Sequence, residues 1–236
     1  MKIKTLELIE GAKKAEGLTV IIDVFRAFST VCYLYKSGAK KVLISKSLED
    51  SYALKKNNSS IILAGERHGK KLDGFDIGNS PSEIINKNFK DKIIALTTSA
   101  GTQGIINAKN SDEIIACSFV NVNATINYIK KINPNMLSIV AMGNSGIERA
   151  EEDVFCAEYI KGILTNKINE EEYNRNFNNI KESLKKTKSV QRFFDKDKPW
   201  SPEEDFWLCL EKDKFDYILK VQTNNNNNNN IILNSI

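Results

Sequence analysis

The sequence is poor in histidine and cysteine, and each scarcity narrows the chemistry open to the protein. Among 236 residues His68 is the single histidine, which excludes mechanisms that need two histidines of one chain. The four cysteines have neither CxxC spacing nor histidine partners, so a zinc site is not expected. We expect them to be reduced, mostly buried thiols of a cytoplasmic protein: Cys32, Cys117, Cys156 and Cys209.

Long apolar stretches and strong charge are missing as well. No run approaches the roughly 20 apolar residues that span a bilayer, and the N-terminus has no apolar core of a signal peptide. The net charge of +4 is modest, and the basic residues form no stripe with interleaved aromatics. We therefore expect a soluble protein that binds neither membranes nor nucleic acid.

Short apolar runs alternate with segments of helical spacing, and this order predicts an α/β fold. A strand–helix repeat is typical of a mostly parallel sheet with helices on both faces. The predicted strands are Leu18–Val24, Lys41–Ser45, Ser60–Ala64, Lys92–Thr97, Glu113–Ser118 and Leu137–Met142. The helical segments between them are Arg26–Ser37, Leu48–Asn57, Pro81–Asn88, Thr102–Lys109 and Asn121–Ile132.

The last third of the chain has a different texture. We predict one domain over residues 1–221, in which residues 165–214 form a helical part that covers the site. Phe215–Val221 reads as a last edge strand. The run Asn224–Asn230 is of low complexity, and we expect residues 222–236 to form a weakly ordered tail.

Polar clusters follow the predicted strands at their carboxyl ends, where open α/β sheets bind ligands. Such clusters contain Asp23, Glu66, Thr97 and Gly143, whereas the amino ends carry no comparable set. The segment from Gly65 to Pro81, GERHGKKLDGFDIGNSP, is the densest of them. Because ordinary connections have about 4–6 residues, a polar loop of this length indicates function. The sequence therefore predicts one crevice.

Carboxylates suggest a metal in that crevice. Asp23 ends an apolar strand, where a carboxylate is costly unless it is paired or bound to a metal; a helix cap or an ion pair with Arg26 is the alternative. Together with Glu66 and Asp76 it makes an oxygen-rich site suited to Mg²⁺. Arg67 is then available for phosphoryl oxygens. A surface loop with local ion pairs is the alternative for this loop.

Two further motifs carry candidate residues. TTSAGTQG, from Thr97 to Gly104, is a hydroxyl- and glycine-rich turn into a helix, and backbone N–H groups there bind anions; a plain capping turn is the alternative. It lacks the phosphate-loop and dinucleotide fingerprints. Glu152 and Asp153 stand at another helix start, where they either complement the helix dipole or complete a metal shell.

These motifs, taken in order, resemble a known family. IDVFRAFST, AGERHGKKLDGFDIGNSP, TTSAGT, SFVNVNA and EDVFCA are similar to the 2-phosphosulfolactate phosphatases, the ComB-like family. The resemblance is strong from Val20 to Leu164 and weaker beyond. It departs at Phe25 and Phe28, at His68, and in the asparagine-rich tail.

The resemblance implies a three-layer α/β/α fold and a Mg²⁺-dependent phosphomonoesterase. The substrate implied is (R)-2-phospho-3-sulfolactate, hydrolysed to 3-sulfolactate and phosphate on a route to coenzyme M. A phosphatase of a related hydroxy acid and a non-catalytic organic-anion binding protein are the alternatives, and a homodimer is expected. The catalytic candidates are Asp23, Glu66, Asp76 and Arg26; the substrate-binding candidates are Arg67, Asn79, Ser80, Thr97, Thr98, Ser99, Gly101 and Thr102; and the metal candidates are Asp23, Glu66, Asp76, Glu152 and Asp153.

Overall fold

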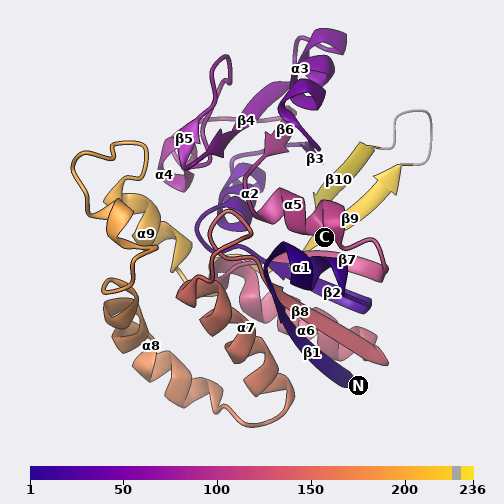
Figure 1. Cartoon of the computed structure of the whole chain (residues 1–236), viewed down its shortest axis with the longest axis vertical. Coiled ribbons are helices and arrows are strands. Elements are labelled where there is room, and N and C mark those ends of the chain that lie inside the picture. The colour runs from indigo at the N-terminus through magenta and orange to yellow at the C-terminus, as the bar shows by residue number, and fades with distance from the viewer. Residues whose placement is uncertain (225–229) are drawn as a thin grey trace.

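A computed structural model describes residues 1–224 and 230–236, which form a ten-stranded sheet covered by helices (Figure 1). In sheet order the strands are β1 (Lys2–Glu7), β8 (Met136–Ala141), β2 (Gly17–Ile22), β7 (Ser111–Cys117), β9 (Leu219–Asn224), β10 (Asn230–Ser235), β3 (Lys41–Ile44), β6 (Ile93–Thr97), β4 (Ile62–Arg67) and β5 (Lys70–Lys71). Two parallel groups, β1-β8-β2-β7 and β3-β6-β4, are joined by the antiparallel pair β9-β10. The predicted α/β fold with a mostly parallel sheet is confirmed.

The helices form a layer on each face of the sheet, as the three-layer prediction requires. They are α1 (Leu8–Lys13), α2 (Ala27–Lys36), α3 (Leu48–Asn57), α4 (Pro81–Ile84), α5 (Gly101–Asn107), α6 (Val122–Ile132), α7 (Glu151–Leu164), α8 (Glu170–Leu184) and α9 (Glu203–Cys209). Because successive strand residues point to opposite faces, Ile21 packs with α2 and α5, while Val20 and Ile22 pack with α6 and α7. All four cysteines are buried free thiols.

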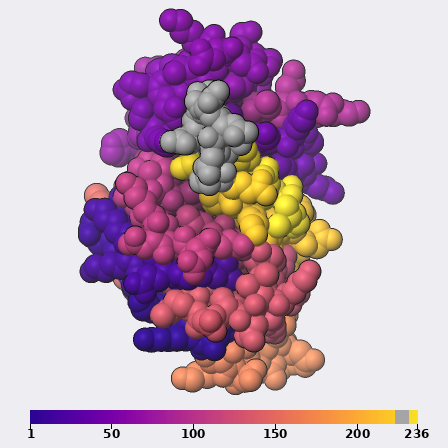
Figure 2. All heavy atoms as spheres, turned by 90° about the vertical axis from the view of Figure 1, so that its right-hand side faces the viewer, coloured from indigo at the N-terminus to yellow at the C-terminus, as the bar shows by residue number. Residues whose placement is uncertain are grey.

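The C-terminal strands correct two predictions. The expected edge strand at Phe215–Val221 begins and ends later, as β9, and it lies inside the sheet between β7 and β10. The weakly ordered tail expected over residues 222–236 also contains a strand, because residues 230–235 form β10, which pairs with β3. Figure 2 shows this C-terminal segment in yellow, between the purple upper part and the magenta lower part. The prediction for Asn224–Asn230 falls mostly on residues 225–229, which lie outside the described residues.

The amino-terminal strand and helix were not predicted. β1 pairs in parallel with β8 at one edge of the sheet, and its exposed lysines explain why its sequence shows no buried run. Among the described residues no helix combines the length and the apolar character that crossing a membrane requires.

Candidate active site

A small polar pocket lies where β2, β4, β6 and β8 end. Four segments far apart in the sequence meet here, because parallel strands present their carboxyl ends to one side of the sheet. The C-terminal part of the chain closes the pocket through Arg192. The lining residues are Asp23, Phe25, Arg26, Glu66, His68, Gly69, Asn79, Ser99, Ala100, Gly143, Asn144, Ser145 and Arg192.

Asp23 lies in this pocket with only 5% of its surface exposed. It follows β2, and each of its carboxylate oxygens accepts one backbone hydrogen bond, Oδ1 from Ala27 at 3.0 Å and Oδ2 from Gly101 at 2.8 Å. The donors are the amides at the starts of α2 and α5. Burial raises the pKa of Asp23 to about 6, and the charge of Glu66 adds to the rise. The group therefore exchanges a proton near neutral pH.

Glu66, at the end of β4, is the second carboxylate of the pocket. Oε1 accepts the Ser99 amide at 2.7 Å, and Oε2 accepts the Gly69 amide at 2.7 Å and the Ser99 hydroxyl at 3.3 Å. These bonds tie β4 to the turn after β6, so the carboxylate is fixed. Asn79 also faces the pocket, and its buried Oδ1 has no hydrogen-bond partner among the residues described. It is thus available to a ligand.

Glu152 and Asp153 lie behind the pocket rather than in its lining. Asp153 accepts the amides of Val24 and Gly143, both at 2.8 Å, and so joins the ends of β2 and β8. Glu152 accepts the Ser189 hydroxyl at 3.0 Å. Burial raises the pKa of Glu152 to about 7 and the pKa of Asp153 well above its usual range, the latter also through the charges of Glu152 and Asp23. These raised pKa values favour the neutral carboxyl forms near neutral pH, so the two groups would ionise more readily with a cation nearby.

Arg26 is held in a buried network. Nη1 donates to Asp205 Oδ2 at 2.6 Å and to the Trp200 carbonyl at 3.0 Å, and Nη2 donates to the Gly69 carbonyl at 3.0 Å. Asp205 Oδ1 in turn accepts from Ser80 Oγ at 3.0 Å and from the Ser82 amide at 2.9 Å. The guanidinium predicted to be catalytic thus clamps α9 against two loops of the pocket.

Asp76 and Arg67 do not reach the pocket. Asp76 Oδ2 accepts the Leu63 amide at 2.7 Å and pairs with Lys55 at 2.9 Å on the outer side of β4. Because Leu63 lies in β4, thirteen residues earlier in the sequence, this hydrogen bond holds the loop to the strand. Arg67 donates to the Glu66 carbonyl at 2.7 Å and to Thr97 Oγ1 at 3.2 Å. It opens onto the neighbouring surface instead.

The other hydroxyl candidates build the walls. Thr98 and Thr102 bond to each other around the start of α5: the Thr98 amide donates to Thr102 Oγ1 at 3.0 Å, and the Thr102 amide donates to Thr98 Oγ1 at 3.2 Å. Ser80 donates a hydrogen bond to Asp205. Gly101 allows a close approach, since a Cβ there would lie 2.8 Å from Asp23 Oδ2. Of the predicted substrate-binding residues, Asn79 and Ser99 line the pocket.

Arg192 and Asp205 were not found from the sequence. Both lie in the C-terminal third, more than a hundred residues from the motifs that they contact, and no local pattern marks them. The scarcity of arginine, with only five in the chain, is a signal that could have found Arg192, because a chain that uses lysine as its surface cation keeps arginine where a planar fork is needed.

The donor set of the site fits Mg²⁺. Asp23, Glu66, Glu152 and Asp153 are each less than a tenth exposed, and Arg26 is already neutralised by Asp205, so an added cation would balance the charge. Within residues 1–224 and 230–236 no three His, Cys, Asp or Glu side chains are grouped as a metal cage. Mg²⁺ does not need one, since it usually binds one or two carboxylates together with waters and substrate phosphates.

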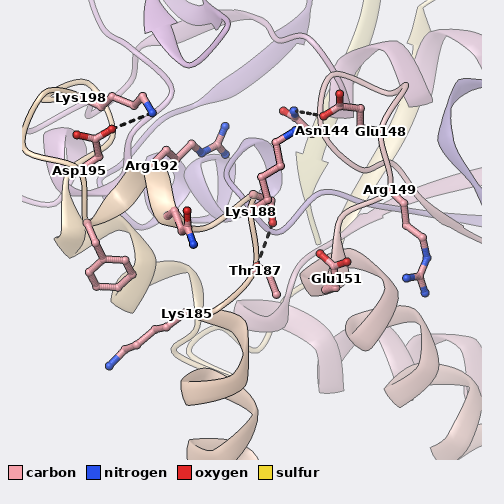
Figure 3. Close-up of a pocket in the computed structure, with 13 residues that line it drawn as sticks. Asn144, Glu148, Arg149, Glu151, Lys185, Thr187, Lys188, Arg192, Asp195 and Lys198 are labelled. Atoms are coloured by element: carbon pink, nitrogen blue, oxygen red, sulfur yellow. Dashed lines mark hydrogen bonds and ion pairs between the residues drawn. The ribbon is translucent and has the colours of Figure 1, made fainter.

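A larger cavity of about 910 Å³ opens beside the pocket, between the loop after β8 and residues 185–198 (Figure 3). The two share Asn144 and Arg192. Figure 3 shows Arg192 and Lys188 extending toward the loop that carries Asn144, whereas Arg149 and Lys185 point away from it. A ligand in the pocket would therefore extend into a space whose lining carries five cations and three carboxylates.

Comparison with known proteins gives a consistent result. The family model described as 2-phosphosulpholactate phosphatase matches residues 3–224. A protein of Bacillus subtilis (strain 168) is 32% identical over 209 residues, covering 87% of each chain. One of Thermotoga petrophila is 34% identical over 80% of this chain and 85% of its own, and one of Caldanaerobacter subterraneus subsp. tengcongensis is 30% identical over 93% of each. All three are named probable 2-phosphosulfolactate phosphatase.

Proposed function

The chain belongs to the 2-phosphosulpholactate phosphatase family, and on that premise we propose that it is a Mg²⁺-dependent phosphomonoesterase that hydrolyses 2-phospho-3-sulfolactate to 3-sulfolactate and phosphate. The observation that carries the proposal is the pair Asp23 and Glu66. Both carboxylates are buried in one pocket and fixed by backbone amides. Fixed charges of this kind need no reorganisation when the reaction occurs.

Asp23 is the group that would take the proton of the attacking water. A general base works best when its pKa lies near the working pH, and burial brings the pKa of Asp23 to about 6. The water oxygen forms a bond to phosphorus as the bond from phosphorus to the C2 oxygen breaks, and that leaving oxygen takes up a proton from water. Asp23 would also orient the water, because both of its oxygens are held by the amides of Ala27 and Gly101.

Glu66 is the residue that would hold Mg²⁺ in the pocket. When bound, the ion would neutralise charge on the transferring phosphoryl group. Asn79 would accept a hydrogen bond from a water through its unpartnered Oδ1, and Ser99 would keep Glu66 in place. A cation in front of Glu152 and Asp153 would lower their raised pKa values, because a nearby opposite charge favours the ionised form.

Release of inorganic phosphate from 2-phospho-3-sulfolactate tests the proposal. We expect the purified chain to release phosphate with Mg²⁺, to stop when EDTA is added, and to recover when Mg²⁺ is returned in excess. Turnover that EDTA leaves unchanged would contradict the metal requirement. Binding of 3-sulfolactate without any turnover of phosphomonoesters would instead identify a non-catalytic anion-binding protein.

A further inference from the structure

Arg192 is a guanidinium with hydrogen-bond donors to spare. It lines both the pocket and the larger cavity beside it. Nη2 donates to the Phe25 carbonyl at 3.0 Å, and the buried Nε has no hydrogen-bond partner in the part of the chain that the structure describes. A buried donor without a partner is costly, so a ligand that accepts from it would be favoured.

Arg192 differs in this respect from the other arginine of the pocket. Arg26 uses both Nη atoms on Asp205, Trp200 and Gly69, and its charge is neutralised by an ion pair of 2.6 Å. No carboxylate lies within ion-pair distance of Arg192 among the described residues. Arg192 is thus the arginine that can serve a bound anion.

The cations around the larger cavity divide in the same way. Three of the five are already paired with carboxylates: Arg149 with Glu7 at 3.2 Å, Lys185 with Glu182 at 2.7 Å and Lys198 with Asp195 at 2.9 Å. Lys188 forms no ion pair within the described ranges, and it extends in the same direction as Arg192 (Figure 3). Arg192 and Lys188 are therefore the cations of the cavity without an ion pair, and Glu148 and Glu151 are the lining carboxylates without one within the described ranges.

The inner pocket and the larger cavity differ in volume, and this difference indicates which end of a substrate each can hold. The inner pocket, of about 30 Å³, has room for roughly one water-sized group, whereas the cavity beside it measures about 910 Å³. A space of this size would hold the attacking water against Asp23, and the phosphoryl group would then lie at the mouth of the inner pocket. The leaving half of the substrate, with its remaining acid groups, then extends past Arg192 into the larger cavity.

We propose that Arg192 and Lys188 bind the sulfonate of the leaving half and thereby select sulfonated over unsulfonated phosphate esters; this rests on the proposed function. A sulfonate has three oxygens in a tetrahedral arrangement, which suits a guanidinium and an ammonium that approach from different positions on one segment. A carboxylate, by contrast, is satisfied in the plane of a single guanidinium fork. The pair is a specificity determinant, and Asp23 and Glu66 act on every phosphate ester alike.

Two substrates and two pairs of variants test the proposal. The substrates are 2-phospho-3-sulfolactate and 2-phospholactate, which differ only in the sulfonate. Arg192→Gln is matched by Arg149→Gln, an arginine already paired with Glu7. Lys188→Gln is matched by Lys186→Gln, an exposed neighbour outside the cavity lining. Thermal unfolding of all four variants confirms that each is folded.

We expect Arg192→Gln to lower kcat/KM for the sulfonated substrate by about 100-fold and Lys188→Gln by about 10-fold, as for the loss of charge-assisted hydrogen bonds. Lys188→Gln should change kcat/KM for 2-phospholactate by less than about threefold. Arg192→Gln, whose guanidinium also lines the inner pocket, should lower it for 2-phospholactate about tenfold less than for the sulfonated substrate, and the two control variants should change neither. Equal losses on both substrates would overturn the proposal, because Arg192 would then act on the phosphoryl group.

If the wild-type protein hydrolyses neither ester, the proposed function is refuted, but the subsite can still be tested. Calorimetric binding of 3-sulfolactate and of lactate provides that test. We expect 3-sulfolactate to bind wild-type protein more tightly than lactate, and Arg192→Gln but not Arg149→Gln to remove the difference. Equal binding of the two acids, or no binding of either, would overturn the subsite.

Discussion

Replacing Asp205 by asparagine would leave the buried guanidinium of Arg26 without its carboxylate. The side chains of the pair are 2% and 0% exposed, and Nη1 lies 2.6 Å from Oδ2. The asparagine oxygen can still accept from Ser80 and Ser82, but its Nδ2 would then face Arg26 Nη1, so the change removes both the charge and the acceptor of the guanidinium. Breaking a buried ion pair from one side costs about 3–5 kcal/mol. For a chain of this length each kcal/mol lowers Tm by about 2–4 °C, so we expect a fall of about 6–20 °C.

Urea unfolding and thermal melting of a double-mutant cycle measure this effect. The cycle comprises Asp205→Asn, Arg26→Met and the double variant, and Glu182→Gln is the control because its pair with Lys185 is exposed and worth at most about 1 kcal/mol. We expect the double variant to be clearly more stable than the sum of the single effects predicts. Additivity within about 0.5 kcal/mol would refute the reasoning, as would a cost of Asp205→Asn no larger than that of the control.

Three further predictions concern the pocket. Asp76→Asn removes an ion pair of partly exposed groups with Lys55, so we expect a loss of at most about 1 kcal/mol in stability and unchanged phosphatase activity; a loss of activity as deep as that of Asp23→Asn would place this carboxylate in the site after all. The pKa of Asp23 rises from 3.8 to about 6 on folding, so the folded state binds protons more tightly than the unfolded state. In EDTA the free energy of unfolding should therefore fall as pH rises from about 4 through 7, and Asp23 should account for about 3 kcal/mol of that fall. Urea unfolding of wild type and Asp23→Asn at pH 5 and pH 8 measures it, and a wild-type stability that rises with pH contradicts it. Gly101→Ala places a Cβ 2.8 Å from Asp23 Oδ2, so we expect a strong fall in kcat with a stability cost of about 1–3 kcal/mol; full activity in the phosphate-release assay would show that Asp23 tolerates displacement.

The parallel part of the fold could be predicted because its strands are buried on both faces. Runs such as Leu18–Val24 are apolar throughout, and the polar residue that ends each run marks the carboxyl edge of the sheet. β1 and β10 gave no such signal. β1 mixes charged and apolar residues, and β10 has only a short apolar run, residues 231–233, after the asparagine-rich segment. Their partners, β8 and β3, lie far away along the chain. Tertiary pairing rather than local preference makes them strands.

The candidate site could likewise be predicted only in part from the sequence. Asp23 and Glu66 follow buried strands, where a carboxylate attracts notice, and the structure brings both into one pocket. Asp76 carries the same chemistry in the same motif, yet it pairs with Lys55 and accepts the Leu63 amide, because the loop folds back along β4 at this point. Arg192 lies in a segment that contains no motif and reaches the pocket only through the fold. Side-chain direction and long-range closure are properties of the folded chain, and spacing alone does not reveal them.

Measuring kcat and the Mg²⁺ dependence of phosphate release for Asp23→Asn and Glu66→Gln, with 2-phospho-3-sulfolactate as substrate, tests the central claim most directly. If Asp23 takes the proton of the water, Asp23→Asn should lower kcat by about 10²–10⁴-fold and leave the Mg²⁺ concentration for half-maximal activity nearly unchanged. Glu66→Gln should instead raise that concentration. Wild-type turnover by Asp23→Asn would contradict the account.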